Sequence, residues 1–278
     1  MTFPLFGPGD DPGPSFADLL RRTGNVAPAP TSSVEGVTHG TTVVALRYTD
    51  GVVMAGDRRA TSGNLISHRT MEKVYPADRH SGVAIAGAAG PAMDMVKLFQ
   101  LQLEHYEKVE GAELSLEGKA NQLSGMVRQH LPAAMQGLVV VPLFAGYDTR
   151  RGAGRLFQYD VTGGRYEEGD FASTGSGSLH AGTVMKLGFR RPLDRSGALD
   201  LAISAIFQAA DEDSATGGPD LVRGIYPTMA TITGDGFERV GEEEVADRFK
   251  ALVAGMTAPE GTAADAAPAP TMPGTPAP

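Results

Sequence analysis

The sequence of 278 residues contains no cysteine and no tryptophan. Without a thiol there is no disulfide scaffold, no thiolate zinc site, no iron–sulfur cluster and no cysteine nucleophile. Basic residues are also in deficit, because 24 Lys and Arg stand against 33 Asp and Glu and the net charge is −9. A general nucleic-acid binder would present a basic face, so that function is not expected.

Long hydrophobic runs are missing as well. A long uncharged stretch, residues 131–147, is interrupted by Pro132, Gln136, Gly137 and Pro142, whereas a helix that spans a membrane needs about 20 apolar residues. The N-terminus begins MTFPLFGPGDDPG, which lacks the positive region and the continuous apolar core of a secretory signal. We therefore expect a cytoplasmic protein that does not enter a membrane.

Proline is unevenly distributed and divides the chain. Six of the 19 prolines lie in residues 1–40 and six more in residues 257–278. We expect residues 1–40 to form a disordered leader and the Ala/Pro-rich residues 257–278 to form a flexible tail. Residues 41–256 are then expected to fold as one body.

Strands and helices are predicted in blocks within this central region. Patterns typical of strands occupy residues 41–48, 52–57, 82–87, 139–148, 154–160 and 226–233. Helical periodicity predicts helices over residues 91–110, 123–134, 179–187, 199–210 and 242–253. Pro132 is expected to kink or end its helix, and Pro142 to place its strand at a sheet edge or a bulge. This order favours an α+β fold of two antiparallel sheets between helix pairs.

Several common catalytic patterns are absent from the sequence. The six histidines show no metal-ligand spacing, and no G-x-S-x-G or P-loop motif is present. TGSGS at residues 174–178 has the wrong spacing for a serine hydrolase and is typical of a turn before a helix. No metal and no cofactor are therefore expected.

The start of the first strand offers a different chemistry. A cut between Gly40 and Thr41 would expose an N-terminal threonine, whose free amine has a pKa of about 7.7–8.0 and lies beside its own Oγ. Because Gly40 has no Cβ, a neighbouring hydroxyl can approach its carbonyl closely. Taken alone, Gly-Thr-Thr is better explained as an ordinary strand start.

Several longer motifs resemble those of a known protein family. The segment TTVVALRYTDGVVMAGDRRAT (residues 41–61) resembles the start of mature proteasome β subunits, which are N-terminal-nucleophile threonine proteases. RTMEKVY, AIAG, TGSGS and DEDSATGGPD follow in family-like order at residues 69–75, 84–87, 174–178 and 211–220. LEHYEK, AAMQG and DSATGGPDLVRGI, which begin at residues 103, 133 and 213, are similar to the actinobacterial type. The resemblance covers the central region from Thr41 to about Val253.

The resemblance implies a four-layer αββα sandwich, the N-terminal-nucleophile hydrolase fold, and assigns catalytic roles. Thr41 would be the nucleophile through its Oγ, with its own amine as general base. Lys73 would be the cation beside the nucleophile, where a positive charge lowers the pKa of the amine or hydroxyl. Asp57 would hold Lys73, and both are expected to be at least partly buried. Gly87 would donate its N–H to the oxyanion.

Further residues are matched to support and to substrate binding. Ser176, Asp213 and Thr216 match the polar network around the nucleophile, although archaeal relatives more often have Ser where this chain has Thr216. A pocket for the side chain before the scissile bond would be lined by Ala60, Met71, Ile85, Ala89 and Met93. Thr61 would pair its backbone with an extended substrate. Because the pocket side chains are small or apolar, we expect a preference for apolar residues.

The resemblance also implies processing and partners. Residues 1–40 would be a propeptide, removed autocatalytically when Thr41 attacks the Gly40 carbonyl. The chain would assemble in seven-membered β rings inside α-subunit rings. An ATPase ring would feed in substrates like those tagged by Pup, a small ubiquitin-like protein.

Three alternatives remain open. The chain could be a structural ring subunit without catalysis, a small-molecule amidase of the same fold, or a bacterial two-ring relative that works without α subunits. Structural subunits typically lack the threonine or the lysine, so the presence of Thr41, Asp57, Lys73 and Gly87 favours an active enzyme. An amidase pocket would need polar groups, which are not evident. The AGDRRAT and DSATGGPD segments favour the proteasome itself.

Overall fold

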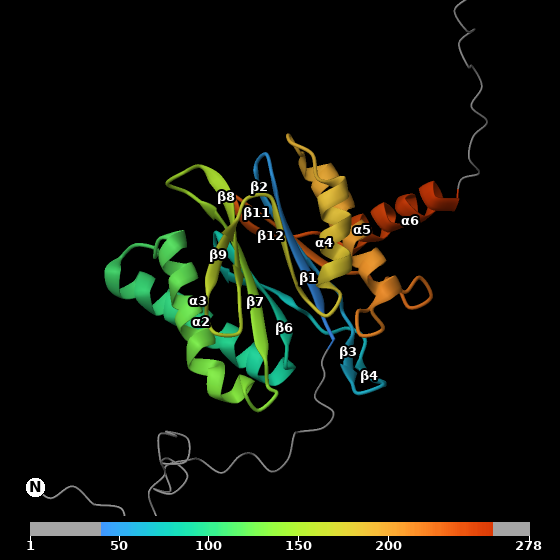
Figure 1. Cartoon of the computed structure of the whole chain (residues 1–278). Helices are drawn as coiled ribbons and strands as arrows, with labels where there is room; N and C mark the ends of the chain where they lie inside the picture. Colours follow the sequence, from blue (N-terminus) through green and yellow to red (C-terminus); the bar gives the residue numbers. More distant parts are fainter. Residues whose placement is uncertain (1–39, 258–278) are drawn as a thin grey trace, which may run out of the picture.

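Two five-stranded antiparallel sheets face each other in the computed structural model, which describes residues 40–257 (Figure 1). The first sheet has the order β10-β1-β2-β11-β12, with β1 (Thr42–Tyr48), β2 (Gly51–Gly56), β10 (Phe171–Gly175), β11 (Thr228–Thr233) and β12 (Gly236–Arg239). The second runs β5-β6-β7-β8-β9, with β5 (Val74–Asp78), β6 (Ser81–Gly87), β7 (Val140–Asp148), β8 (Ala153–Tyr159) and β9 (Arg165–Glu168). A separate hairpin consists of β3 (Ala60–Ser62) and β4 (Leu65–His68).

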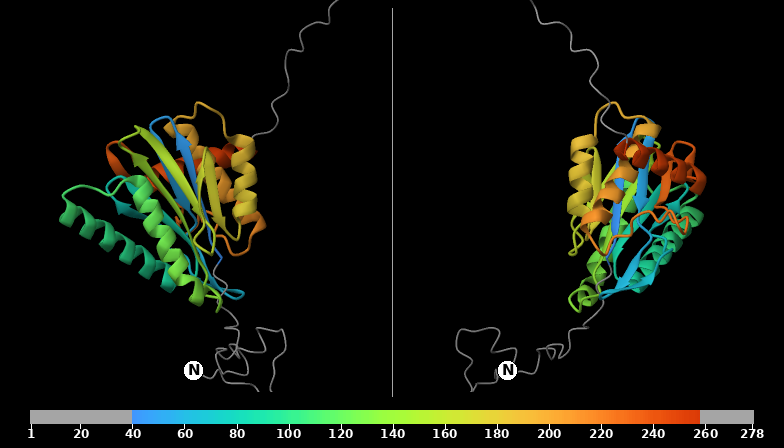
Figure 2. Two further views of the ribbon diagram at one scale, coloured as in Figure 1. Left: turned by 60° about the vertical axis from the view of Figure 1, so that its left-hand side comes forward. Right: turned by 90° about the vertical axis from the view of Figure 1, so that its right-hand side faces the viewer.

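Helices cover the outer face of each sheet. The first sheet packs against α4 (Ser178–Gly188), α5 (Arg195–Glu212) and α6 (Glu242–Thr257). The second packs against α2 (Ala89–Glu110) and α3 (Leu116–Ala134). The views in Figures 1 and 2 show the resulting helix–sheet–sheet–helix order. The predicted four-layer α+β sandwich is therefore confirmed.

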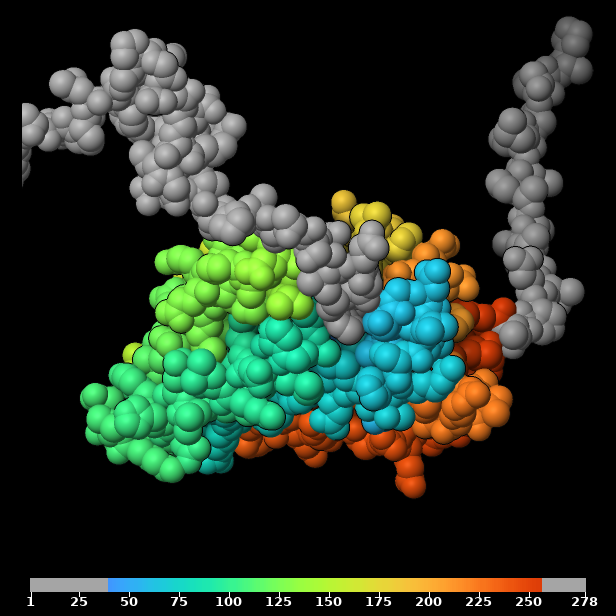
Figure 3. Space-filling model, turned by 90° about the horizontal axis from the view of Figure 1, so that it is seen from below, coloured from blue at the N-terminus to red at the C-terminus, as the bar shows by residue number. Residues whose placement is uncertain are grey.

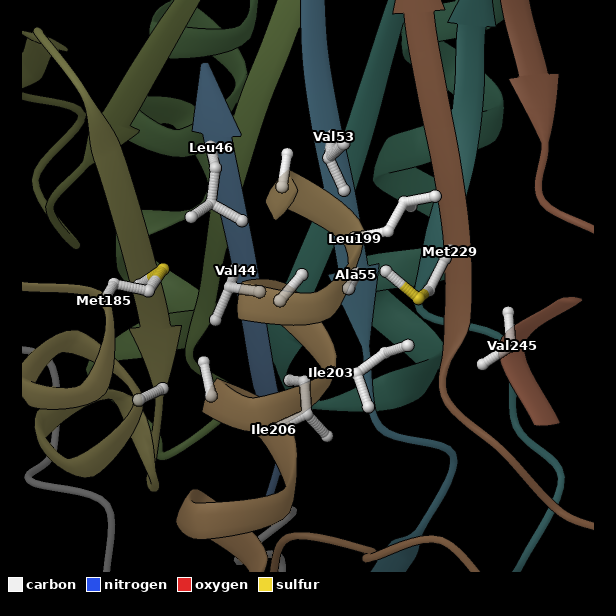
Figure 4. Close-up of a cluster of buried hydrophobic side chains, with 14 of the residues drawn as sticks. Val44, Leu46, Val53, Ala55, Met185, Leu199, Ile203, Ile206, Met229 and Val245 are labelled. Carbon is white, nitrogen blue, oxygen red and sulfur yellow. The ribbon is translucent and has the colours of Figure 1, made fainter. Parts of the chain in front are cut away.

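The alternation of side chains along β1 explains why it is buried on both faces. Val44 and Leu46 point toward the helices and join the apolar cluster shown in Figure 4. Val43 and Ala45 point the other way, into the cluster between the two sheets. All four side chains are fully buried. A slip of one residue would exchange the two sets, so packing on both faces fixes the register that places Thr41 at the strand's beginning.

Pro142 behaves differently from its prediction. It was expected to place its strand at an edge or bulge, but β7 is the middle strand of its sheet. Pro142 pairs with Ile85 of β6, and the pairing with β8 begins only at Leu143. The proline therefore lies where β7 has a partner on one side only, which is where a missing N–H can be tolerated. The helix that contains Pro132 continues through the proline and ends at Ala134, the last residue of the predicted range, so the expected early end is not observed.

The predictions for the two ends of the chain fall mostly outside the described residues. Residues 1–39 of the predicted leader and 258–278 of the predicted tail are not described. Helix α6 includes Thr257, so regular structure extends one residue into the segment assigned to the tail. Within residues 40–257, no helix is both long enough and apolar enough to cross a membrane.

Leu199 tests the packing of α5 on the first sheet. It is fully buried, so Leu199→Ala is expected to lower the free energy of unfolding by about 2–5 kcal/mol through lost contacts and a residual cavity. Leu187→Ala on α4 is the matched control, because Leu187 is 70% exposed and should change stability by no more than about 0.5 kcal/mol. Urea denaturation measures both; equal losses would contradict the packing described.

Candidate active site

Four segments that are distant in sequence meet at the start of β1. The loop after β2 contributes Asp57, and the segment before β5 contributes Lys73. The turn between β10 and α4 contributes Ser176, and the segment after α5 contributes Asp213 and Thr216. In Figure 3 the light-blue β3–β4 hairpin lies beside the orange segment that follows α5. The structure thus gathers five predicted site residues around the Gly40–Thr41 peptide.

The Thr41 hydroxyl lies against the peptide bond that precedes it. Its Oγ1 donates a hydrogen bond to the Gly40 carbonyl oxygen at 2.7 Å. Lys73 Nζ reaches the same oxygen at 3.4 Å. On the other side, the Gly40 N–H donates to Thr61 Oγ1 at 3.2 Å. The hydroxyl, a cation and the carbonyl of the predicted cleavage point are therefore within one hydrogen-bonded group.

Only glycine fits at position 40. A Cβ at Gly40 would lie 1.8 Å from the Cβ and 2.6 Å from the Cα of Ala215. Real Cβ atoms do not approach backbone this closely, so a side chain would push Gly40 away from the segment after α5. The absence of a side chain therefore brings the Gly40 carbonyl into the group.

Lys73 and Asp57 form a buried ion pair beside Thr41. The distance from Nζ to Oδ1 is 2.7 Å, and the side chains are 1% and 0% exposed. Lys73 Nζ also donates to the Arg59 carbonyl at 2.6 Å. Burial lowers the pKa of Lys73, because removal from water disfavours its charged form, and the charge of Asp57 acts in the opposite direction. The expected burial of both residues is observed.

Asp57 accepts hydrogen bonds from four donors. Its Oδ1 accepts from Lys73 and from the Thr42 N–H at 2.9 Å. Its Oδ2 accepts from the N–H groups of Arg59 at 2.9 Å and Gly217 at 2.8 Å. A buried carboxylate needs such partners, since the loss of water is otherwise very costly. Asp57 therefore joins the strand start, the lysine and the segment after α5.

A second carboxylate, Asp213, organises the hydroxyl groups on the other side of Thr41. Ser176 Oγ and Thr216 Oγ1 both donate to Asp213 Oδ2, the latter at 2.6 Å. The Thr41 N–H donates to Ser176 Oγ at 3.3 Å. Burial acts to raise the pKa of Asp213, but the hydrogen bonds from Ser176 and Thr216 outweigh it and lower the pKa. An ionised Asp213 thus orients Ser176 toward the backbone nitrogen of Thr41.

Three residues of this group were not singled out in the sequence. The Thr42 hydroxyl lies 2.6 Å from Thr216 Oγ1 and accepts the Gly177 N–H at 3.0 Å. Arg59 and Gly217 act through backbone atoms, as the contacts to Lys73 and Asp57 show. Thr42 could have been found from the sequence, because it is next to the predicted nucleophile. Arg59 and Gly217 could not, because a contact through backbone atoms does not require a particular residue type.

Gly87 ends β6 in the second sheet. Its φ is +112°, and a Cβ there would lie 2.0 Å from the Val139 carbonyl oxygen, so another residue would be strained and would clash. Among the hydrogen bonds of residues 40–257, none joins Gly87 to the Gly40–Thr41 peptide. Its oxyanion role therefore stays a prediction.

The predicted pocket residues come from four places. Ala60 lies in β3, Ile85 in β6, Met71 precedes β5, and Ala89 and Met93 share the first turns of α2. Ala60 and Ile85 are buried, whereas Met93 is exposed. Ile85 packs in the core beneath α2, so its side chain can contribute only to a pocket floor. Thr61 pairs with Ile66 of β4, and its hydroxyl also accepts the Gly40 N–H.

Within residues 40–257, no group of three or more His, Asp or Glu side chains is placed to hold a metal ion. The acid–base groups of the site are thus a threonine, a lysine, two aspartates and further hydroxyls.

A family model and several relatives match this chain over most of its length. The family model described as proteasome subunit matches residues 37–222, more than half of the chain. A proteasome subunit beta of Acidimicrobium ferrooxidans is 58% identical over 254 residues, which cover 88% of this chain and 92% of that protein. Proteins with the same description in Streptomyces griseus subsp. griseus and Jonesia denitrificans are 54% and 51% identical. These two alignments cover 86% and 84% of this chain, and 87% and 80% of the relatives.

The family model and the relatives each match more than half of the chain. The range matched by the family model includes Thr41, Asp57, Lys73, Ser176 and Asp213. The relatives with high identity are proteasome β subunits of actinobacteria. The chain belongs to the proteasome subunit family and is of the actinobacterial β type.

Proposed function

We propose that this chain is the proteolytic β subunit of a proteasome core particle and hydrolyses peptide bonds of unfolded proteins with Thr41 as nucleophile. The observation that carries the proposal is the contact of Thr41 Oγ1 with the Gly40 carbonyl at 2.7 Å, beside the buried Lys73. Structural ring subunits typically lack the threonine or the lysine, so the presence of Thr41 and Lys73 together favours the proteolytic role.

Self-cleavage would convert the chain into its active form. Thr41 Oγ attacks the Gly40 carbonyl carbon, and its proton passes, through Lys73 or a water, to the nitrogen of Thr41. The C–N bond breaks and Gly40 is left as an ester on Oγ. Lys73, 3.4 Å from the carbonyl oxygen, stabilises the negative charge that develops there. Water then hydrolyses the ester and leaves a free Thr41 amine.

Peptide hydrolysis would reuse the same atoms. The new amine, held near Ser176 Oγ, takes the proton from Thr41 Oγ as the oxygen attacks the substrate carbonyl. The positive charge of Lys73 favours the deprotonated forms of its neighbours. The Gly87 N–H would bind the oxyanion, a type of contact worth roughly 2.7–4 kcal/mol of barrier. When the tetrahedral intermediate collapses, the peptide C–N bond breaks and the Thr41 ammonium gives its proton to the leaving amine. Water then hydrolyses the acyl ester on Oγ, which releases the acid and regenerates Thr41.

Assembly into rings follows from the family. We infer that copies of this chain form seven-membered rings within rings of α subunits, in the cytoplasm, and that an ATPase ring delivers Pup-like tagged substrates. Exposed leucines support burial against neighbours: Leu98 and Leu101 on α2, and Leu179 and Leu187 on α4.

Intact mass tests self-cleavage. After co-expression with its α-subunit partner, the wild-type chain is expected to have the mass of residues 41–278, because Thr41 Oγ cuts its own peptide bond. Thr41→Ala should keep the mass of all 278 residues. Thr149→Ala, on an exposed turn, is the matched control and should be cut like wild type. An uncut wild type in an assembled particle would reject this maturation and favour a structural role.

Lys73→Met tests the role of the buried cation. We expect peptide hydrolysis to fall by at least about 10²-fold, the lower end of the range for acid–base groups. Lys119→Met is the matched control, because Lys119 is also buried and lies 2.5 Å from a carboxylate oxygen of Asp78, away from Thr41. Both substitutions leave a carboxylate unpaired and should destabilise the fold, but only the first should remove activity. Comparable activity losses at matched folded concentration would argue against the role.

Substrate preference tests the pocket. Because its predicted lining is small or apolar, fluorogenic peptides with Leu or Tyr before the cleaved bond should be hydrolysed faster than those with Arg or Asp. The measurement is kcat/KM on the assembled particle. Faster cleavage after Arg or Asp would show that other side chains define the pocket.

A further inference from the structure

A small cleft of about 30 Å³ is lined by residues that contact the Asp57–Lys73 pair, among them Arg59 and Gly217. Three arginines line it: Arg58 and Arg59 from the loop after β2, and Arg69 from the segment after β4. The opposite wall belongs to the segment after α5, with Gly217 and Asp220. Three guanidinium groups thus gather around a space of a few water molecules.

Their charge is only partly balanced. Asp220 is the acid in this lining, and its carboxylate already binds Arg223 at 2.6 Å and the N–H groups of Val222 and Arg223. Arg59 donates to the neutral Ser214 carbonyl. Arg69 forms no salt bridge with any residue in 40–257. The cleft is therefore positively charged.

The Arg58 guanidinium has few strong partners. Its Nε is buried and has no hydrogen-bond partner within the described residues, and its Nη2 donates to the Thr70 carbonyl at 3.4 Å. The guanidinium also pairs with Glu242, whose side chain is 78% exposed, and such exposed pairs bind weakly.

We propose that this cleft is a binding site for a small oxyanion of the phosphate or sulfate class. The planar guanidinium fork matches two oxygens of such an anion, and converging arginines are the usual protein partners of phosphate. The anion balances the charge of Arg69, which forms no salt bridge within residues 40–257, and adds a second partner for the Arg58 guanidinium. The size of the cleft suits a compact anion held at its mouth and excludes a nucleotide.

The cleft shares two residues with the candidate active site. The Arg59 carbonyl accepts from Lys73, and the Gly217 N–H donates to Asp57. A bound anion would hold the loop after β2 against the segment after α5, and so would brace the buried ion pair. Anion binding to the cleft does not depend on the proposed protease function. An effect of the anion on peptide hydrolysis would depend on it.

Titration of the full-length chain with inorganic phosphate tests the site, against chloride at equal ionic strength. Calorimetry should show one saturable site. In Arg58→Gln/Arg69→Gln the affinity should fall at least about tenfold, since two charged donors are lost. Arg150→Gln/Arg151→Gln removes the same number of charges from an exposed turn of the second sheet and should bind phosphate like wild type.

Glu242→Gln is expected to raise the affinity for phosphate, whereas the double variant is expected to lower it. This second test does not require the double variant to fold. The substitution removes the carboxylate that competes for Arg58, so phosphate should bind more tightly than to wild type. No saturable binding to the wild type would mean that the cleft holds water only and would overturn the proposal. Equal affinity in the double variant would do the same. Binding of a short acidic peptide but not of phosphate would assign the cleft to a protein carboxylate instead, which also contradicts it.

Discussion

The buried ion pair between Asp57 and Lys73 is the constraint on which the rest of the site depends. Two charges removed from water are costly unless every remaining donor and acceptor is matched. Asp57 meets this requirement with four donors, and Lys73 with the Asp57 carboxylate and two carbonyl oxygens. Because the partners are the backbones of Gly40, Arg59 and Gly217, three separate segments must be in place together. Satisfying the charges therefore also places the Thr41 hydroxyl.

The two-sheet sandwich supplies the rigidity for this arrangement. β1 is packed on both faces, so Thr41 extends from a strand whose register cannot slip without exchanging two apolar sets. Opposite it, β5 and β6 carry Lys73 and Gly87 from the second sheet. The nucleophile and its cation thus come from different sheets, and the core between the sheets sets their separation. Packing far from the site is in this way a condition for its geometry.

Much of the fold was predictable from local patterns. The strand-like patterns in residues 41–48 and 82–87 and the helical periodicity after Pro91 each correspond to an observed element. Pro142 was misjudged, because its effect depends on where the neighbouring strand β8 begins, and that is a property of the sheet. The short strands β3, β4, β5, β9, β10 and β12 were not predicted, since segments of three to five residues carry too little periodicity.

The sequence by itself determined which chemistry is available. The absence of cysteine excluded a thiol nucleophile, and the motifs in family order, not the Gly-Thr-Thr sequence alone, pointed to Thr41 as an N-terminal nucleophile. The tertiary structure decided what the residues do to one another. It alone buried Lys73 against Asp57, brought Ala215 against Gly40, and turned Ser176 toward Thr41. These contacts join residues up to 175 positions apart in the chain (Gly40 and Ala215), and many of them use backbone atoms that every residue type shares. Residue identity can reveal a nucleophile, but only folding sets the distance and the loss of water that activate it.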